Sequence, residues 1–148
     1  MSGEVFTYDA RNVHVIVGGV PMSGFADETF VSIAAENDLY EKSVGADGDV
    51  SRSRRNDDTG VLTLTLKQTS QSNDVLSALL AADRAGNGGL VDVLVQESGS
   101  GRTIVFAQAA WIKRYPNLVY GPNVENREWQ IDLAGLNYFI GGNAGSAS

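Results

Sequence analysis

Charged side chains that could bind a metal or a partner gather between Asp47 and Asp58, a segment with four aspartates and three arginines. Its first part, Asp47-Gly-Asp49-Val-Ser51, alternates oxygen-bearing side chains in the way that a calcium-binding loop requires. However, Arg52 occupies the place of the glycine in that loop, and Asp58 stands in the twelfth place instead of a bidentate glutamate. These departures argue against calcium, so we predict no metal and no cofactor.

Catalytic patterns are absent elsewhere in the sequence. The chain has no cysteine, which excludes disulfides, thiolate catalysis and cysteine-bound metals, and its single histidine, His14, lies in an apolar stretch. One histidine cannot make a histidine-based zinc site, and no G-x-S-x-G nucleophile elbow is present. The glycines of 86–89 follow a helical pattern and precede a strand, which is the reverse of the order in a phosphate-binding loop. We therefore predict no catalytic residues, and that the protein is not an enzyme.

Composition limits the possible partners. The chain has 148 residues, 43% of them hydrophobic, which suits one domain with one core. Its net charge of −7 gives no basic surface for binding nucleic acid. No run of 18 apolar residues and no signal-peptide pattern is found, so we expect no membrane association.

Most of the predicted elements are strands that would position these charges. Val61–Leu66 alternates strictly, with Leu62, Leu64 and Leu66 on one side, and these leucines should enter the core. The only convincing helix is Ser72–Ala85, with capping by Ser72, Asn73 or Asp74 and a left-handed ending at Gly86. Further strands are expected at 12–17, 29–35, 90–96, 103–110, 127–133 and 136–140, and residues 111–115 either extend the strand at 103–110 or begin a neighbouring one.

About seven strands and one helix, without a βαβ rhythm, indicate the fold class. We predict a mainly β protein, an antiparallel β-sandwich or barrel with one flanking α-helix. In the strand at 127–133, the inward-facing residues should be Trp129, Ile131 and Leu133. The outward-facing residues should be Glu128, Gln130 and Asp132.

The segment at about 42–60 shows neither a helical nor a strand period in this interpretation, and we predict a long charged loop. A catalytic loop, a metal loop, a docking loop and a merely solvated loop all remain possible from the residues alone. The chain as a whole is expected to form a single domain over 1–142, followed by a flexible tail at 143–148.

Three blocks of the sequence resemble the tail-tube proteins of contractile-tailed (myovirus-type) bacteriophages. They are VGADGDVSRSRRNDDTGVLTLTLKQTSQSNDVLSAL, the AWI at 110–112, and NREWQIDLAGLNYFIGG, which ends at Gly142. The resemblance extends from about Val13 to Gly142. It implies a small β-sandwich or barrel with a flanking helix, which assembles into hexameric rings that stack into a hollow tube.

The resemblance also implies a place in the virion and a set of partners. The protein would be a structural part of the phage tail, assembled in the cytoplasm of the bacterial host. Its partners would be further copies of itself and the sheath, tape-measure and baseplate proteins. DNA would pass through the lumen without specific binding, because outside 47–58 the chain has 14 acidic and 8 basic residues and would repel it.

The resemblance assigns roles to two sets of residues. The long loop would reach subunits of the next ring, where electrostatic complementarity would set the register. Its charged residues are Asp47, Asp49, Arg52, Arg54, Arg55, Asp57 and Asp58. The residues expected to face the lumen are Glu128, Gln130 and Asp132.

Two other functions remain as alternatives. A tube component of a bacterial type VI-like secretion or contractile-injection system would have the same architecture. A β-sandwich ligand-binding module, for example one that binds carbohydrate, would need a concave patch of exposed aromatic residues. Against that module, we expect most of Trp111, Trp129, Tyr138 and Phe139 at alternating, core-like positions.

Overall fold

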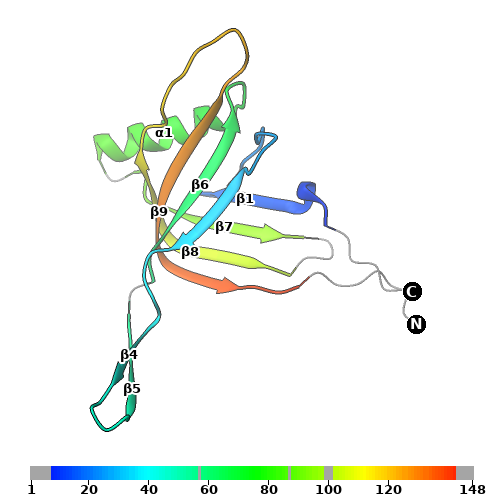
Figure 1. The fold of residues 1–148 in the computed structure, drawn as a ribbon. Helices are drawn as coiled ribbons and strands as arrows, with labels where there is room; N and C mark the ends of the chain where they lie inside the picture. The colour runs from blue at the N-terminus through cyan, green and yellow to red at the C-terminus, as the bar shows by residue number, and fades with distance from the viewer. Residues whose placement is uncertain (1–7, 57, 87, 99–101, 143–148) are drawn as a thin grey trace, which may run out of the picture.

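The structure is a computed structural model that describes residues 8–56, 58–86, 88–98 and 102–142 (Figure 1). Asp57 and the predicted tail at 143–148 therefore lie outside the described residues. Within the described ranges the chain forms nine β-strands, one α-helix and a short 3-10 helix. The elements in chain order are η1 (Ala10–Asn12), β1 (Val13–Val17), β2 (Val20–Pro21), β3 (Val31–Ala35), β4 (Tyr40–Val44), β5 (Val50–Arg54), β6 (Gly60–Lys67), α1 (Ser72–Ala85), β7 (Val91–Glu97), β8 (Ile104–Arg114) and β9 (Asn126–Phe139).

Seven of the strands form one antiparallel sheet in the order β2-β1-β7-β8-β9-β6-β3, and β4 pairs with β5 alone. The mainly β, antiparallel fold with one helix is therefore confirmed. Figure 1 shows the half of the sheet that contains β1 and β7 running across the half that contains β3 and β6. The long strands β8 and β9 belong to both halves and join them. Residues 111–114 thus extend the strand that begins at Ile104, and the two strands predicted at 127–133 and 136–140 form one continuous strand.

The corner between the two halves lies where Gln108 of β8 meets Gly135 of β9. Along β8 the buried residues change from Val105 and Ala107 to Ala110, which shifts the alternation by one residue. Gly135 has a φ of +66°, a conformation that side chains with a Cβ rarely adopt. A Cβ at this position would also lie 3.1 Å from Cβ of Gln108. Glycine therefore lets β9 bend and fold the sheet over its own core.

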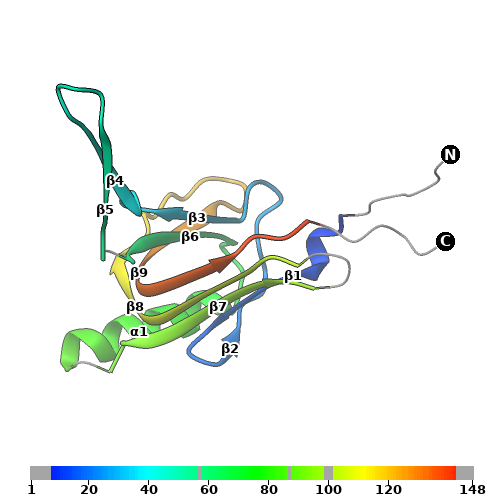
Figure 2. The same ribbon diagram turned by 90° about the horizontal axis from the view of Figure 1, so that it is seen from below.

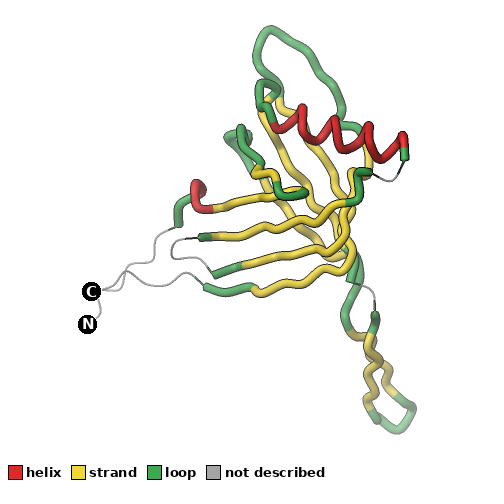
Figure 3. Tube along the Cα trace, turned by 180° about the vertical axis from the view of Figure 1, so that it is seen from behind, coloured by secondary structure: helices red, strands yellow, loops and turns green. Residues whose placement is uncertain are grey.

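The core lies inside this bend, as the alternating patterns predicted. Leu62, Leu64 and Leu66 of β6 are each 0% exposed, and Trp129, Ile131 and Leu133 of β9 are also buried. Leu76 and Leu80 bring the apolar side of α1 to the same cluster. Figure 3 shows α1 lying against one side of the sheet, close to the β8–β9 connection. Burial of such side chains provides most of the free energy that favours folding.

The helix has the predicted bounds, but its ends differ from the prediction. No side chain caps it from the N-cap residue, Gln71, and the Ser72 N–H donates to Ser70 Oγ at 3.2 Å instead. Asn73 bonds elsewhere, because its amide nitrogen donates to the carbonyl of Lys67. The predicted left-handed ending at Gly86 is wrong, since φ there is −178°, an extended conformation.

The prediction of a loop without strand period at 42–60 is also wrong. Val44 pairs with Val50 and Tyr40 with Arg54, so β4 and β5 form a regular antiparallel hairpin. The alternation that indicates these strands is present in the sequence, where serines and arginines alternate over 51–54. It was concealed because it alternates polar with charged residues, and no apolar face marks it as a strand.

Candidate functional site

The β4–β5 hairpin, together with its flanks here called the hairpin (residues 39–55), projects away from the rest of the fold. Figure 2 shows it extending from the body of the sheet, and every residue of β4 and β5 is exposed. At its base, the Arg55 N–H donates to the carbonyl of Leu39 at 2.9 Å. An isolated two-stranded hairpin is marginally stable in water. The hairpin would therefore gain stability from contact with another surface.

The two faces of the hairpin differ in chemistry because alternate residues point to opposite sides. The Arg52 guanidinium lies 4.5 Å from the centre of the Tyr40 ring, and that of Arg54 lies 5.9 Å from it. On the opposite face, Glu41 has a weak ion pair with Arg55 at 3.9 Å. The basic and apolar face consists of Tyr40, Lys42, Val44, Val50, Arg52 and Arg54. The other face consists of Glu41, Ser43, Ser51 and Ser53.

The tip of the hairpin is acidic, with Asp47 and Asp49 in the turn between the strands. Asp47 Oδ1 accepts a long hydrogen bond of 3.5 Å from the Asp49 N–H. Asp58 lies beyond β5, whose five residues extend roughly 17 Å, so it cannot join the tip aspartates around one ion. Its backbone carbonyl accepts from Leu136 N at 3.0 Å, close to the sheet corner. The structure thus separates Asp58 from the tip, and Asp57 is not among the described residues.

The residues proposed to face a lumen lie together on the outer side of β9. Gln130 and Asp132 are half-buried and Glu128 is exposed, while Trp129 and Ile131 between them are buried. On the neighbouring strand β6, Thr65 pairs with Glu128, Thr63 with Gln130 and Val61 with Asp132. The predicted inward and outward sides of this strand are confirmed. Their orientation toward a lumen remains a prediction.

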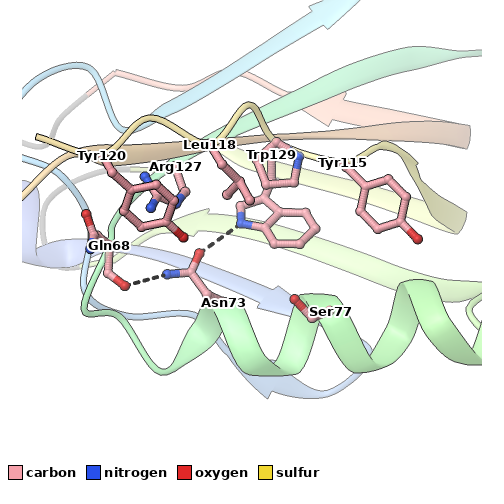
Figure 4. A pocket seen from close by; sticks show the side chains of 9 residues that line it. Gln68, Asn73, Ser77, Tyr115, Leu118, Tyr120, Arg127 and Trp129 are labelled. Atoms are coloured by element: carbon pink, nitrogen blue, oxygen red, sulfur yellow. Dashed lines mark hydrogen bonds between the residues drawn. The ribbon is translucent and has the colours of Figure 1, made fainter.

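A cavity of about 370 Å³ lies between α1 and the β8–β9 loop (residues 115–125). Figure 4 shows the side chains that line it. At its inner wall the Trp129 Nε1–H donates to Asn73 Oδ1 at 2.9 Å, which ties β9 to the first turn of α1. The lining residues are Gln68, Asn73, Ser77, Tyr115, Pro116, Leu118, Tyr120, Arg127 and Trp129.

Arg127, which lines this cavity, was not identified from the sequence. It is only 5% exposed, and its guanidinium lies 5.1 Å from the centre of the Tyr120 ring. A signal for it was present, because Arg127 stands two residues before Trp129 and so belongs to the inward side of β9. We name this space the Arg127 cavity.

Two other polar groups have only local contacts. His14 is exposed, and its Nε2 lies 3.0 Å from Ser98 Oγ, with no carboxylate bonded to the imidazole among the residues that the structure describes. Near the N-terminal end of β1, hydrogen bonds from the Arg11 side chain and backbone N–H lower the pKa of Asp9 to about 2. Neither contact forms a catalytic arrangement of acid, base and nucleophile.

The described residues offer neither a metal site nor a membrane-spanning helix. No group of three or more histidine, cysteine, aspartate or glutamate side chains is placed to hold a metal within 8–56, 58–86, 88–98 and 102–142. In the same ranges, the helix is too short and too polar to cross a membrane.

The fold is that of the tube proteins of contractile injection systems. The anti-feeding prophage cap, which terminates that tube, is similar with a TM-score of 0.64 and 9% identity, over 95% of this chain and 96% of the other. A chain from the sheath/tube terminator of the extracellular contractile injection system PVC has a TM-score of 0.61 and 10% identity, over 92% and 99% of the chains. A chain from the PVC sheath–tube complex has a TM-score of 0.58 and 10% identity, over 90% and 92%.

The sequence identifies the particular family. Residues 13–141 match the model of the bacteriophage PhiTE tail tube protein, and the chain belongs to this family. "Structural protein ORF10" of Pseudomonas phage KPP10 is 29% identical over 151 residues, covering 97% of this chain and 87% of that protein. The chain is therefore a structural subunit of a phage tail tube, and the resemblance noted in the sequence is confirmed. A tail tube subunit belongs to the virion.

Proposed function

We propose that this tail tube protein assembles into hexameric rings, and that the rings stack into a hollow tube through which phage DNA is delivered. The observation that carries the proposal is the fully exposed hairpin at one end of the fold. A contact between one end of a subunit and a different surface of the next does not close on itself, so it repeats along a filament. The hairpin supplies such a contact.

The proposed partners follow from this architecture. Assembly takes place in the host cytoplasm, the sheath surrounds the tube, and the tape-measure and baseplate proteins set its length and start. The role is structural and not enzymatic. A lumen that includes Glu128 and Asp132 repels DNA of the same charge, so DNA passes without being bound.

Negative-stain electron microscopy of the purified protein across a concentration series tests the proposal. Hollow tubes of uniform width, built of six-fold rings, are the expected result. Rings of another symmetry would overturn the hexamer. Particles that never stack, even when a baseplate preparation is added as a nucleus, would overturn the assembly itself.

The hairpin is tested by charge reversal. Arg54→Glu/Arg55→Glu should greatly reduce stacking and leave the subunit folded, because both side chains are exposed. The matched control is Arg54→Lys/Arg55→Lys, which keeps the charge at the same two positions. If the reversed variant forms tubes as well as the control does, these two arginines have no role in docking.

A further inference from the structure

The buried guanidinium of Arg127 has no acidic partner in its own chain, as far as the described residues show. The ion pairs found there join Arg11 to Asp9, Arg55 to Glu41 and Lys67 to Asp27. Arg127 instead donates two long hydrogen bonds to the carbonyls of Val119 and Asn126, at 3.5 and 3.4 Å. A buried charge is costly unless it is paired. The Arg127 cavity is therefore suited to a carboxylate from outside the chain.

The Arg127 cavity lies at the opposite end of the molecule from the hairpin. Figures 1 and 3 both show the β8–β9 loop at one end and β4–β5 at the other. In this loop, Leu118 is 63% and Tyr120 is 73% exposed, and both side chains line the cavity. Figure 4 shows Tyr120 over Arg127 and Leu118 beside Trp129. An apolar rim around a buried cation is typical of an anchor pocket in a protein interface.

The tip of the hairpin has the complementary charge. Asp47 and Asp49 are exposed, and neither forms an ion pair among the residues that the structure describes. Arginine binds carboxylates with a planar fork of donors, which favours this pairing over a diffuse attraction. The exposed turn presents both carboxylates ahead of the strands.

A second zone of complementarity lies beside the first. The Glu125 backbone N–H donates to Oε1 of Gln68 at 3.2 Å, and Gln68 lines the Arg127 cavity, so Glu125 lies at its edge. The basic face of the hairpin, with Lys42, Arg52 and Arg54, lies directly behind the acidic tip. An acidic tip with a basic shaft behind it thus matches a cationic cavity with one acidic residue, Glu125, at its edge.

We infer that the hairpin tip of one subunit inserts into the Arg127 cavity of a subunit in the adjacent ring, with Asp47 or Asp49 paired to Arg127. This inference rests on the proposed stacking and names the surface that receives the hairpin. The contact joins two different ends of the same chain, so each subunit gives one hairpin and receives one. Because both zones must match, the charges select a single register.

Disulfide trapping tests the contact directly, since the chain has no cysteine of its own. Ala46→Cys/Leu118→Cys places one thiol at the tip and one in the cavity rim without removing either aspartate. After oxidation, assembled tubes should give a ladder of linked subunits on a non-reducing gel. The control Ala46→Cys/Ala81→Cys places the second thiol on the exposed part of α1 and should give no ladder.

Removal of the charges gives an independent measure. Asp47→Asn/Asp49→Asn should raise the critical concentration for tube formation about tenfold, as expected when a charge pair is lost at an interface. Both positions are exposed, so folding is not at risk. Arg127→Lys keeps the charge and should raise the critical concentration less than Arg127→Gln does. Circular dichroism should show that both variants fold.

The outcomes separate this inference from the proposed function. Normal tubes without a ladder from the Ala46→Cys/Leu118→Cys variant, or an unchanged critical concentration for Asp47→Asn/Asp49→Asn, overturn the docking and leave the tube intact. If the parent chain forms no tubes under any condition, nucleated or not, the proposed stacking fails, and the docking fails with it.

Discussion

β6 and the hairpin strands have the same alternating geometry but opposite environments. In β6, Leu64 is 0% exposed, whereas Val44 and Val50 of the hairpin are 61% and 66% exposed. The difference is not in the strands themselves. The leucine face of β6 is covered by the other half of the bent sheet and by α1, while no element of the described chain covers the hairpin. Alternation creates two faces, and a second layer decides which of them is buried.

The strongest test of this comparison is to remove the hairpin. Replacement of residues 40–54 by Asn-Gly joins Leu39 to Arg55, which are already hydrogen-bonded at 2.9 Å. We expect tube formation to be abolished while the free energy of unfolding changes by less than about 1 kcal/mol, because a short loop closes the same ends. Electron microscopy and urea unfolding measure the two effects. A variant that unfolds would show that the hairpin belongs to the folding unit.

A cavity beside β6 should instead lower the stability of the subunit. Leu64→Ala removes a fully buried side chain and should lower the free energy of unfolding by about 3 kcal/mol. Val50→Ala in the hairpin should change it by less than about 0.5 kcal/mol, because Val50 is exposed. Urea unfolding followed by tryptophan fluorescence gives both values. Equal losses in the two variants would contradict the division into a covered and an uncovered region.

A substitution at the corner of the sheet should reduce stability by a smaller amount. Gly135→Ala places a Cβ on a residue with φ of +66° and should cost about 1–2 kcal/mol. The control is Gly142→Ala, where a Cβ would meet nothing within 4 Å. Thermal unfolding of both variants measures the difference. Similar melting temperatures for the two would mean that β9 bends without the help of glycine.

The smallest expected effect lies within the hairpin. Arg52→Ala removes the cation from the Tyr40 ring, and an exposed pair of this kind contributes about 0.5–1 kcal/mol. Amide hydrogen exchange in β4 and β5 of the monomer should become faster, with the exchange of β6 unchanged. Ser53→Ala, on the other face, should leave exchange unaffected. Faster exchange in both variants would show that the hairpin has no distinct faces.

The residues predicted most accurately are those where an apolar period gives the signal. The leucines of β6, the inward side of β9 and the bounds of α1 were all evident, because the core selects for these patterns. The hairpin was missed, since its strands alternate without an apolar face. Tyr138 and Phe139 were expected at core-like positions, yet they are 41% and 64% exposed, because both lie beyond Leu136, the last buried residue of β9.

The sequence by itself determined the strands that carry an apolar face, the single helix and the membership of the tail tube family, because periodicity and a long matching pattern are local along the chain. Only the tertiary structure decided that Arg127 is buried beneath the β8–β9 loop and that the acidic tip lies at the far end from it. Such facts depend on which elements cover one another and which end of the fold each loop reaches. The loop that covers Arg127 and the distance of the tip from it are set by segments far apart in sequence, so no local pattern contains them.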